Sequence, residues 1–303
     1  MRDYSVLDAV LDAANIRYKK DEPMCGHTTF KIGGPADRYV IIENSEQLKK
    51  VIVSLKENEI PYLMLGNGSN MLVPDDGLRG VVIVLDGDFK KISLKGENRI
   101  ICGSGATLAA LCGFARSNSL TGLEFAWGIP GAVGGALYMN AGAYGGEMKQ
   151  VTTRVYYMDE DGTEGLYTGE DIQFGYRKSA FMGTKKVILK AEFELQRGVE
   201  TEITAMMDDL MQRRKSKQPV ELPSAGSVFK RPEGYFAGAL VEECSLKGCV
   251  VGGACVSEKH AGFIVNIGNA TCADVEALIA HIQDVVMKEK GVALEPEVRR
   301  VHL

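Results

Sequence analysis

The spacing of apolar residues along the chain predicts both helices and strands. Apolar side chains recur at helical spacing in residues 5–14, 45–55, 107–116, 203–211 and 275–286. Short apolar runs at 38–42, 61–65, 81–85 and 100–102 predict strands. Two further expected strands, 152–158 and 163–167, flank Asp161-Gly162, a dipeptide that favours a tight hairpin turn. Mixed α and β structure is therefore expected throughout.

Residues at the ends of these segments set the expected limits of the helices. Ser45 is expected to cap the second helix, and Thr271-Cys272-Ala273-Asp274 resembles a capping box ahead of the last one. Gly291 is expected to end that last helix. We expect a domain boundary near the start of the helix at 203–211. One face of that helix is expected to carry Ile203, Met206, Met207, Leu210 and Met211.

Length and composition narrow the class of protein. At 303 residues the chain exceeds one ordinary core of about 150 residues, so two or three packed units are expected. The net charge is −5 and no basic run stands out, which argues against nucleic-acid binding. The first 20 residues mix charged with apolar side chains, unlike a signal peptide, and no apolar run approaches the ~18 residues of a membrane span.

Cysteine usage indicates the redox environment. The seven cysteines include no C-x-x-C pair, a pattern that favours free thiols in a reducing cytoplasm over disulfides or structural zinc. The four histidines add no metal-ligand spacing. We therefore expect a cytoplasmic protein without a metal site.

A short polar loop, Gly66-Asn67-Gly68-Ser69-Asn70, follows the expected strand at 61–65. Its two glycines allow consecutive N–H groups to converge on an anion. Met71 stands where the motif G-x-G-x-x-G needs its third glycine, and a strand and a turn follow where that motif needs a helix. Taken alone, the loop is explained equally well as a plain β-turn or as a phosphate site.

A second concentration of glycine is harder to explain as a turn. Each glycine costs about 0.5–1 kcal/mol in a regular element, so a cluster of them implies that bare backbone must touch a ligand. Interleaved apolar residues, including the only tryptophan, Trp127, argue against a flexible linker. Pro130 is expected to start a short helix whose first N–H groups face a phosphate or a ring carbonyl. The eight glycines of this belt are Gly122, Gly128, Gly131, Gly134, Gly135, Gly142, Gly145 and Gly146.

With these motifs in view, the whole chain resembles the UDP-N-acetylenolpyruvoylglucosamine reductase family of flavoenzymes. The opening signature is residues 28–37, Thr-Thr-Phe-Lys-Ile-Gly-Gly-Pro-Ala-Asp. The loop 66–70 and the belt 128–146 match the family's FAD-binding segments. Three more segments match its catalytic motifs: 176–179 (Tyr-Arg-Lys-Ser), 224–230 (Ser-Ala-Gly-Ser-Val-Phe-Lys) and 294–299 (Leu-Glu-Pro-Glu-Val-Arg).

The resemblance implies an α+β fold. It consists of a two-lobed FAD-binding domain of the vanillyl-alcohol-oxidase (PCMH) type, followed by a C-terminal α+β substrate-binding domain. On this basis we expect a first FAD-binding lobe at 1–86, a second at 87–198 and the substrate domain at 199–303. The length indicates the family's shorter form. Two departures stand out: Arg231 replaces an asparagine common after Phe-Lys, and the chain ends at 300–303 without the usual glycine.

The resemblance also implies the reaction and its cofactors. NADPH reduces non-covalently held FAD, and hydride from flavin N5 then passes to C3 of the enolpyruvyl group of a UDP-sugar, while a proton reaches C2. The product is UDP-N-acetylmuramate, a peptidoglycan precursor. A flavin supplies only the hydride, so the protein must supply the proton and stabilise the charge that develops.

The motif matches assign these tasks to particular residues. Ser227 is the expected proton donor, Arg177 and Glu297 are expected to stabilise the enolate, and Lys230 and Arg299 are expected to contact the substrate's carboxylate or diphosphate. Without the resemblance, Ser227 reads as part of a turn, and Arg177 and Glu297 as surface charges. The expected FAD-binding residues are Gly66, Asn67, Gly68, Ser69, Asn70, Gly128, Pro130, Gly131, Gly134, Gly135, Ala136 and Gly142.

Two other functions remain open on the sequence. An FAD-dependent oxidase of the same fold would pass electrons to oxygen, and such enzymes often tether the flavin through His or Cys, neither of which occurs in 61–74. A regulatory flavin- or nucleotide-binding module would have no need of Arg177, Ser227 and Glu297 together.

Overall fold

The computed structural model describes residues 2–303, which divide into two compact units. Of the described residues, unit 1 contains 2–20, 38–67 and 80–212, and unit 2 contains 21–37, 68–79 and 213–303. Two short segments from the first third of the chain therefore fold with its C-terminal third. The boundaries expected at residues 86 and 198 stay a prediction.

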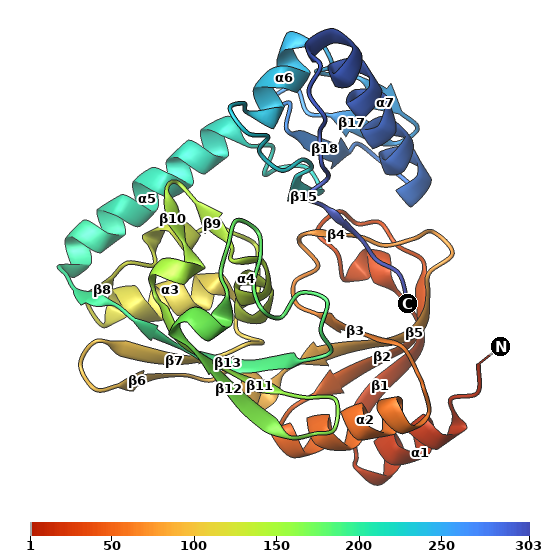
Figure 1. Ribbon diagram of the computed structural model, residues 1–303, viewed down its shortest axis with the longest axis vertical. Helices are drawn as coiled ribbons and strands as arrows, with labels where there is room; N and C mark the ends of the chain where they lie inside the picture. The colour runs from red at the N-terminus through yellow and green to blue at the C-terminus, as the bar shows by residue number, and fades with distance from the viewer. Residues whose placement is uncertain (1) are drawn as a thin grey trace. The chain divides into compact units, whose positions relative to one another are not determined.

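The first sheet, most of whose residues belong to unit 1, has the strand order β1-β2-β5-β3. Its strands are β1 (Arg17–Pro23), β2 (Pro35–Ile42), β5 (Leu78–Leu85) and β3 (Tyr62–Leu65), with β3 and β5 parallel. Helices α1 (Ser5–Ala13) and α2 (Ser45–Glu57) lie along this sheet (Figure 1) and share its apolar core. The cap of α2 is Asn44, whose side chain accepts the Gln47 N–H at 2.9 Å, so the expectation of Ser45 was wrong by one residue.

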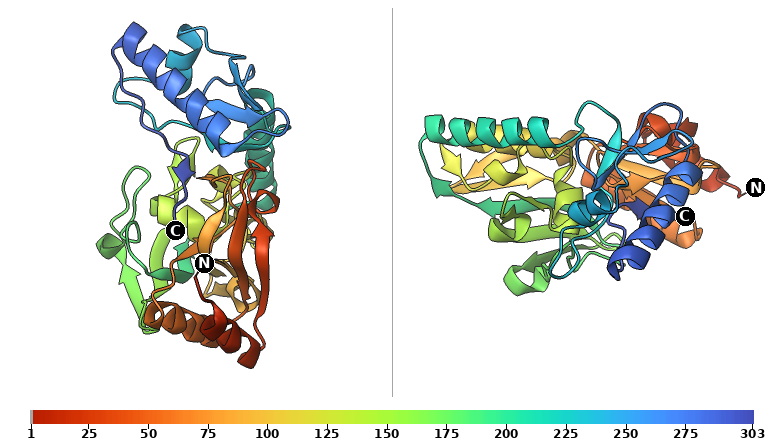
Figure 2. Two further views of the ribbon diagram at one scale, coloured as in Figure 1. Left: turned by 90° about the vertical axis from the view of Figure 1, so that its right-hand side faces the viewer. Right: turned by 90° about the horizontal axis from the view of Figure 1, so that it is seen from above.

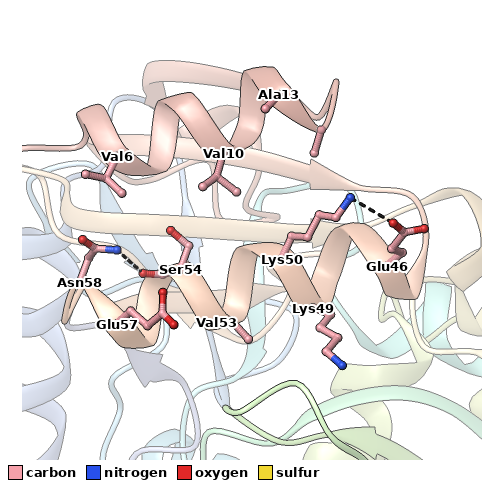
Figure 3. Close-up of a pocket in the computed structure, with 11 residues that line it drawn as sticks. Val6, Val10, Ala13, Glu46, Lys49, Lys50, Val53, Ser54, Glu57 and Asn58 are labelled. Atoms are coloured by element: carbon pink, nitrogen blue, oxygen red, sulfur yellow. Dashed lines mark hydrogen bonds and ion pairs between the residues drawn. The ribbon is translucent and has the colours of Figure 1, made fainter.

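A groove of about 640 Å³ runs between α1 and α2 (Figure 3). Val6, Val10 and Val53 line it, and the Glu46–Lys50 ion pair lies at one end. No residue of the expected active site lines this groove. We assign no function to it.

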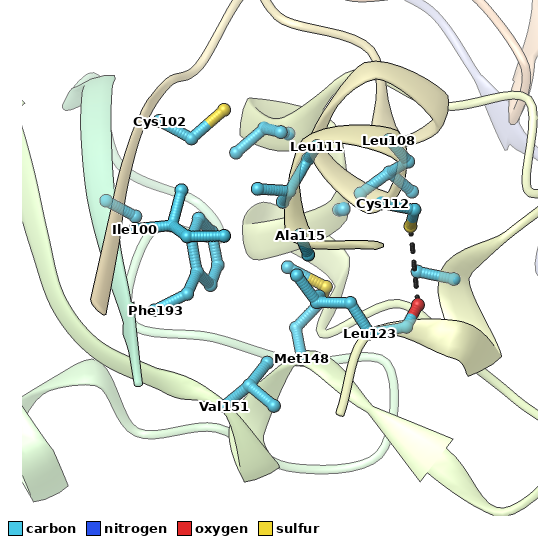
Figure 4. Packing of buried hydrophobic residues seen from close by; sticks show 14 of the residues in the cluster. Ile100, Cys102, Leu108, Leu111, Cys112, Ala115, Leu123, Met148, Val151 and Phe193 are labelled. Carbon is cyan, nitrogen blue, oxygen red and sulfur yellow. Dashed lines mark hydrogen bonds between the residues drawn. The ribbon is translucent and has the colours of Figure 1, made fainter. Parts of the chain in front are cut away.

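The second sheet of unit 1 has the order β12-β11-β13-β7-β6. Helix α3 (Leu108–Ser117) begins after Thr107, whose side chain accepts the Ala110 N–H, and α4 (Val133–Met139) lies within the glycine belt. The strands are β6 (Ile92–Lys95), β7 (Arg99–Gly103), β11 (Thr152–Met158), β12 (Glu164–Thr168) and β13 (Val187–Glu194). Figure 4 shows the core in which α3 packs on Ile100 and Phe193 of this sheet.

Shorter elements complete unit 1. Two-residue strands pair as β8 (Leu120–Thr121) with β14 (Gln196–Arg197), and as β9 (Gly142–Ala143) with β10 (Gly146–Glu147). The 3₁₀ helices in the described part of the chain, in both units, are η1 (Met24–Gly26), η2 (Gly87–Lys90), η3 (Glu124–Ala126), η4 (Met148–Gln150) and η5 (Gly169–Ile172). Helix α5 (Glu200–Lys217) runs across the division between the units. It buries Ile203, Met207 and Leu210, whereas Met206, at the edge of the expected apolar face, is 54% exposed.

Unit 2 is built on an antiparallel sheet of order β15-β18-β17-β16. Helices α6 (Ala237–Glu243) and α7 (Cys272–Lys290) lie beside it (Figure 2) and share its core. The strands are β15 (Ser224–Ser227), β16 (Val250–Val251), β17 (Ala254–Val256) and β18 (Phe263–Asn266). A separate parallel pair joins β4 (Met71–Leu72) to β19 (Arg299–Arg300).

The limits expected for α7 are confirmed. Thr271 and Asp274 form a reciprocal capping box, and Gly291 ends the helix at φ +67°. The carboxylate of Asp75 also accepts the N–H groups of Cys272 and Ala273, at 2.8 and 3.1 Å. The segment that follows the 66–70 loop is thus fastened to the first turn of this helix.

Candidate active site

The 66–70 loop follows β3 and leads into β4, as expected. Gly68 has φ +59°, and a Cβ there would lie 2.3 Å from the carbonyl oxygen of His27. Close packing on residues 27–28 therefore requires this glycine. Within residues 2–303 the N–H groups of Asn67, Gly68 and Ser69 have no hydrogen-bond partner, so they are available to an anion.

The start of α4 differs from the expectation. The helix begins at Val133, not at Pro130, and the N–H groups of Val133 and Gly134 donate to the carbonyls of Ala106 and Ser104, both at 2.8 Å. Residues before Val133 stay extended because Ala132 pairs with Thr107 in an antiparallel bridge. The first two amides of α4 are thus bonded inside the protein and are not available to a phosphate.

The glycines of the belt differ in what surrounds them. A Cβ at Gly134 would lie 3.1 Å from Ser104 Cβ, and one at Gly142 would lie 2.7 Å from the Gly146 carbonyl, so packing explains both. Gly135 is exposed, lies inside α4 and has open space around its Cβ position. Since a helical glycine costs about 1 kcal/mol relative to alanine, Gly135 is a residue whose presence packing does not explain.

Ser104, which the sequence analysis did not single out, lies beside this helix. It is 4% exposed, and its hydroxyl has no hydrogen-bond partner in the described part of the chain. A buried hydroxyl without a partner is costly, and a ligand that supplies one removes that cost. The available signal was its position between Gly103 and Gly105, directly ahead of an expected helix.

Within unit 1 the two expected FAD-binding segments meet. A Cβ at Gly66 would lie 3.1 Å from the Cβ of Ala132, the residue that precedes α4. Gly128 has φ +81°, Gly131 makes only ordinary contacts, Pro130 is exposed and Ala136 is buried inside α4. The 66–67 end of the loop, the unpaired Ser104 hydroxyl and the open face at Gly135 fit a ligand that lies on bare backbone.

Arg177 stands at the tip of a tight turn in unit 1. Gly175 and Lys178 bond each other through both backbone groups, at 3.0 and 3.1 Å, and Arg177 has φ +52°. The turn is fastened to the end of α4, because Asn140 donates to the Gly175 carbonyl at 2.9 Å. The Arg177 guanidinium lies 5.1 Å from the centroid of the exposed Tyr176 ring.

Ser227 ends β15 in unit 2. The ladder between β15 and β18 shifts register between Ser224 and Ser227, and Gly226 has φ +79°. The hydroxyl of Ser227 donates to the Phe229 carbonyl at 3.1 Å, and the Val228 N–H donates to the Gly262 carbonyl at 2.8 Å. Ser227 thus sits on an irregular strand end that is held on both sides, not in a free turn.

The segment with Glu297 packs against this strand end. The Glu297 N–H donates to the Val228 carbonyl at 2.6 Å, and the Glu297 carbonyl accepts the side-chain N–H of Asn70 at 3.2 Å. The Arg299 N–H in turn donates to the Asn70 carbonyl at 3.1 Å. Glu297 lies two residues before β19, and Arg299 is the first residue of that strand.

Lys230, one of the two cations expected to contact the substrate, and Arg231, the departure from the family's asparagine, both have protein partners. Lys230 forms an ion pair with Glu295, whose side chain is 70% exposed. Arg231 stacks on the exposed ring of Phe236, with its guanidinium 4.0 Å from the ring centroid. An incoming phosphate therefore has to compete with Glu295 for Lys230.

The structure brings together four expected segments within unit 2. Residues 28–29, 68–70, 224–229 and 295–299 are joined by direct hydrogen bonds. Arg177, Gly66 and Asn67 belong to unit 1, as do the belt residues. Among residues 2–303 no group of three His, Cys, Asp or Glu side chains is placed to hold a metal ion, and no helix is long and apolar enough to cross a membrane.

Comparison with known proteins decides the family. Residues 36–164 match the model of an FAD binding domain, and residues 218–301 match that of the UDP-N-acetylenolpyruvoylglucosamine reductase C-terminal domain. A reductase of that name from Alkaliphilus oremlandii is 50% identical over 281 residues, 93% of this chain and 92% of the relative. The chain belongs to the UDP-N-acetylenolpyruvoylglucosamine reductase family.

Solved structures agree with this assignment. The reductase of this family from Thermus caldophilus superposes with a TM-score of 0.80 at 37% identity, over 94% of this chain and 98% of the other. A berberine bridge enzyme variant matches 74% of this chain and 51% of its own, with a TM-score of 0.51 at 16% identity. That likeness concerns the fold alone. The expected α+β class, with an FAD-binding domain and a separate C-terminal domain, is confirmed.

The family uses FAD, and the backbone of unit 1 fits it. In unit 1 the unpaired N–H of Asn67 suits a phosphate oxygen, while Ser104 and Gly135 suit a group that lies against the belt. FAD is the cofactor of this oxidoreductase. The assignment of particular residues to it stays a prediction.

Gly135→Ala tests the contact at the open face of α4. Alanine favours a helix by about 1 kcal/mol over glycine, so the apoprotein is expected to melt higher, while FAD affinity falls at least about tenfold because a methyl group stands where backbone meets ligand. Melting curves of the apoprotein and flavin-fluorescence titrations measure the two effects.

Gly113→Ala is the matched control, since Gly113 also lies inside a helix with open space around its Cβ position. It is expected to gain stability without any loss of FAD. Undiminished FAD affinity in Gly135→Ala would remove Gly135 from the cofactor site.

Proposed function

We propose that this chain reduces the enolpyruvyl ether of UDP-N-acetylglucosamine to the lactyl ether of UDP-N-acetylmuramate, with NADPH as reductant. The observation that carries this proposal is the bond from the Glu297 N–H to the Val228 carbonyl at 2.6 Å, which holds Glu297 against the strand end that bears Ser227. These are the two groups that a reduction of a conjugated alkene needs beside a hydride source. The similarity to named reductases over 93% of the chain supports the same reaction.

Bound FAD supplies the redox chemistry, since flavins take hydride from NADPH and can pass it to an electron-poor alkene. Hydride at C3 of the enolpyruvyl group leaves negative charge on C2 and the adjoining carboxylate. The protein has to neutralise that charge and protonate C2 from one side.

Ser227 is the proposed proton donor to C2. Its hydroxyl donates a hydrogen bond to the Phe229 carbonyl at 3.1 Å. It has to break that bond before it can donate its proton to the substrate. A serine is a weak acid, so it serves only where the carbanion is strongly basic and the geometry is fixed. The bonds on either side of the strand end supply that fixed geometry.

Arg177 and Glu297 are proposed to stabilise the enolate. Arg177 contributes a permanent positive charge on a turn that two backbone hydrogen bonds and Asn140 hold in place. Glu297 contributes a hydrogen bond to the developing oxyanion when its carboxyl group is protonated. Lys230 and Arg299 are proposed to contact the diphosphate or the carboxylate of the substrate.

Nothing in residues 2–303 favours the oxidase or the regulatory module over the reductase. Neither alternative function explains why the segments that carry Ser227 and Glu297 are hydrogen-bonded to each other. The proposal places the enzyme in the cytoplasm, where NADPH is available and where the free cysteines stay reduced.

Product analysis tests the proposal. The purified protein, incubated with NADPH and UDP-N-acetylglucosamine enolpyruvate without oxygen, is expected to yield one UDP-N-acetylmuramate for each NADPH oxidised. Mass spectrometry of the nucleotide product and the NADPH absorbance measure both sides of that balance. NADPH consumption that depends on oxygen, with the enolpyruvyl nucleotide recovered unchanged, would identify an oxidase instead.

A further inference from the structure

Thr29, to which no task in the reaction has been assigned, forms hydrogen bonds with both the 66–70 loop and strand β15, which ends at Ser227. Its N–H donates to the Gly68 carbonyl at 3.2 Å, and its hydroxyl donates to the Ser224 carbonyl at 2.7 Å. One residue therefore connects the 66–70 loop to the strand that ends at Ser227. The three segments lie far apart in the sequence and fold together in unit 2.

The loop that carries Thr29 is itself firmly held. The Thr28 hydroxyl and Ile32 bond each other through the Ile32 carbonyl and N–H, at 3.0 and 3.3 Å. The side-chain N–H of the buried Asn266, on β18, donates to the Phe30 carbonyl at 3.1 Å. Phe30 is fully buried in the core of unit 2. Thr29 is thus a fixed point against which other segments are placed.

The bond from Thr29 to the Ser224 carbonyl holds the start of an irregular stretch of β15. The register of β15 against β18 shifts between Ser224 and Ser227, so the regular ladder does not by itself set the direction of the Ser227 side chain. The bond from Thr29 anchors one side of this irregular stretch, and the bond from the Val228 N–H to the Gly262 carbonyl anchors the other. Gly226, at φ +79° with open space around it, offers no packing restraint between them.

We infer that Thr29 is a positioning residue: it fixes the direction of the Ser227 hydroxyl relative to residues 68–70 of the 66–70 loop. The inference rests on the proposed function, because it concerns the proton donor of that reaction. Misplacing a reacting group by about 1 Å costs on the order of 10²-fold in rate. Loss of the Thr29 hydroxyl should therefore slow the step that uses Ser227 far more than the step that does not.

Thr29→Val removes the hydroxyl and keeps the shape of the side chain. The reoxidation of the reduced flavin by the enolpyruvyl nucleotide is expected to slow about tenfold to hundredfold, and its solvent deuterium isotope effect is expected to increase. Reduction of the flavin by NADPH should stay close to the parent rate. Thr29→Ser keeps the hydroxyl and is expected to restore reoxidation to within about threefold of the parent.

Thr271→Val is the control for a general loss of stability. It removes the side-chain cap of α7 in the same unit, which destabilises the protein, and among the described residues Thr271 forms no hydrogen bond with the 224–227 strand. Its two half-reactions should keep the parent ratio and the parent isotope effect. If Thr29→Val does not fold, Thr29→Ala carries the same comparison.

The outcomes separate the inference from the function on which it rests. Selective slowing in Thr29→Val with recovery in Thr29→Ser supports the positioning role. An equal loss in both half-reactions, or parent-like reoxidation while Ser227→Ala is slow, overturns that role and leaves the function standing. A parent enzyme whose reduced flavin the enolpyruvyl nucleotide does not reoxidise overturns both.

Discussion

Ser227→Ala is expected to slow the reoxidation of the flavin by the enolpyruvyl nucleotide roughly 10²–10⁴-fold, the usual cost of a lost general acid. Without the proton, the carbanion at C2 returns its hydride instead of going on to product. Reduction of the flavin by NADPH needs no proton from this serine and should proceed near the parent rate. The change removes one hydrogen bond, to the Phe229 carbonyl, so the fold and the flavin content should survive.

Stopped-flow absorbance of the two half-reactions measures this separation. Ser227→Cys is expected to recover part of the loss, because a thiol is a stronger acid than a hydroxyl. Reoxidation of Ser227→Ala within about tenfold of the parent would mean that another group donates the proton.

Glu297→Gln is expected to slow the same half-reaction by up to about 10²–10³-fold, the effect of losing one donor from an oxyanion site. The variant keeps the shape of the side chain, its backbone bond to Val228 and an N–H donor, but an amide is a far weaker acid than a carboxyl group and donates a weaker hydrogen bond to the oxyanion. Flavin reduction by NADPH should be nearly unchanged. Equal losses in both half-reactions would indicate a structural role instead.

Glu295→Gln is the matched control for that variant. Glu295 is a neighbouring glutamate on the same segment, but it is exposed and engaged with Lys230. Its replacement should leave the rate of reoxidation at saturating substrate close to the parent value. A loss as large as that of Glu297→Gln would show that the segment as a whole, not the carboxyl group of Glu297, is sensitive.

The elements that the sequence predicted best are those set by neighbouring residues. The capping box at Thr271, the stop at Gly291 and the hairpin around Asp161-Gly162 depend on contacts within a few residues, and all three are confirmed. The start of α4 was wrong because its first amides bond to Ser104 and Ala106, a tertiary contact that no local pattern contains.

The motifs of the site could be identified in the sequence, but the hydrogen bonds that connect them could not be predicted from it. The bonds from Thr29 to Ser224 and from Asn70 to Glu297 span 195 and 227 positions in the sequence, respectively. The need of Ser104 for a partner is visible only once the fold has buried its hydroxyl. Likewise, the ion pair that holds Lys230 becomes apparent only when Glu295 lies beside it.

The most direct test of the proposed reaction is the colour of the bound flavin in the parent protein. Without oxygen, NADPH is expected to bleach the flavin absorbance, and UDP-N-acetylglucosamine enolpyruvate alone is then expected to restore it. Acid or heat should release the flavin as free FAD, because 61–74 offers no tethering His or Cys. A flavin that NADPH bleaches but that only oxygen, and not the enolpyruvyl nucleotide, restores would contradict the account.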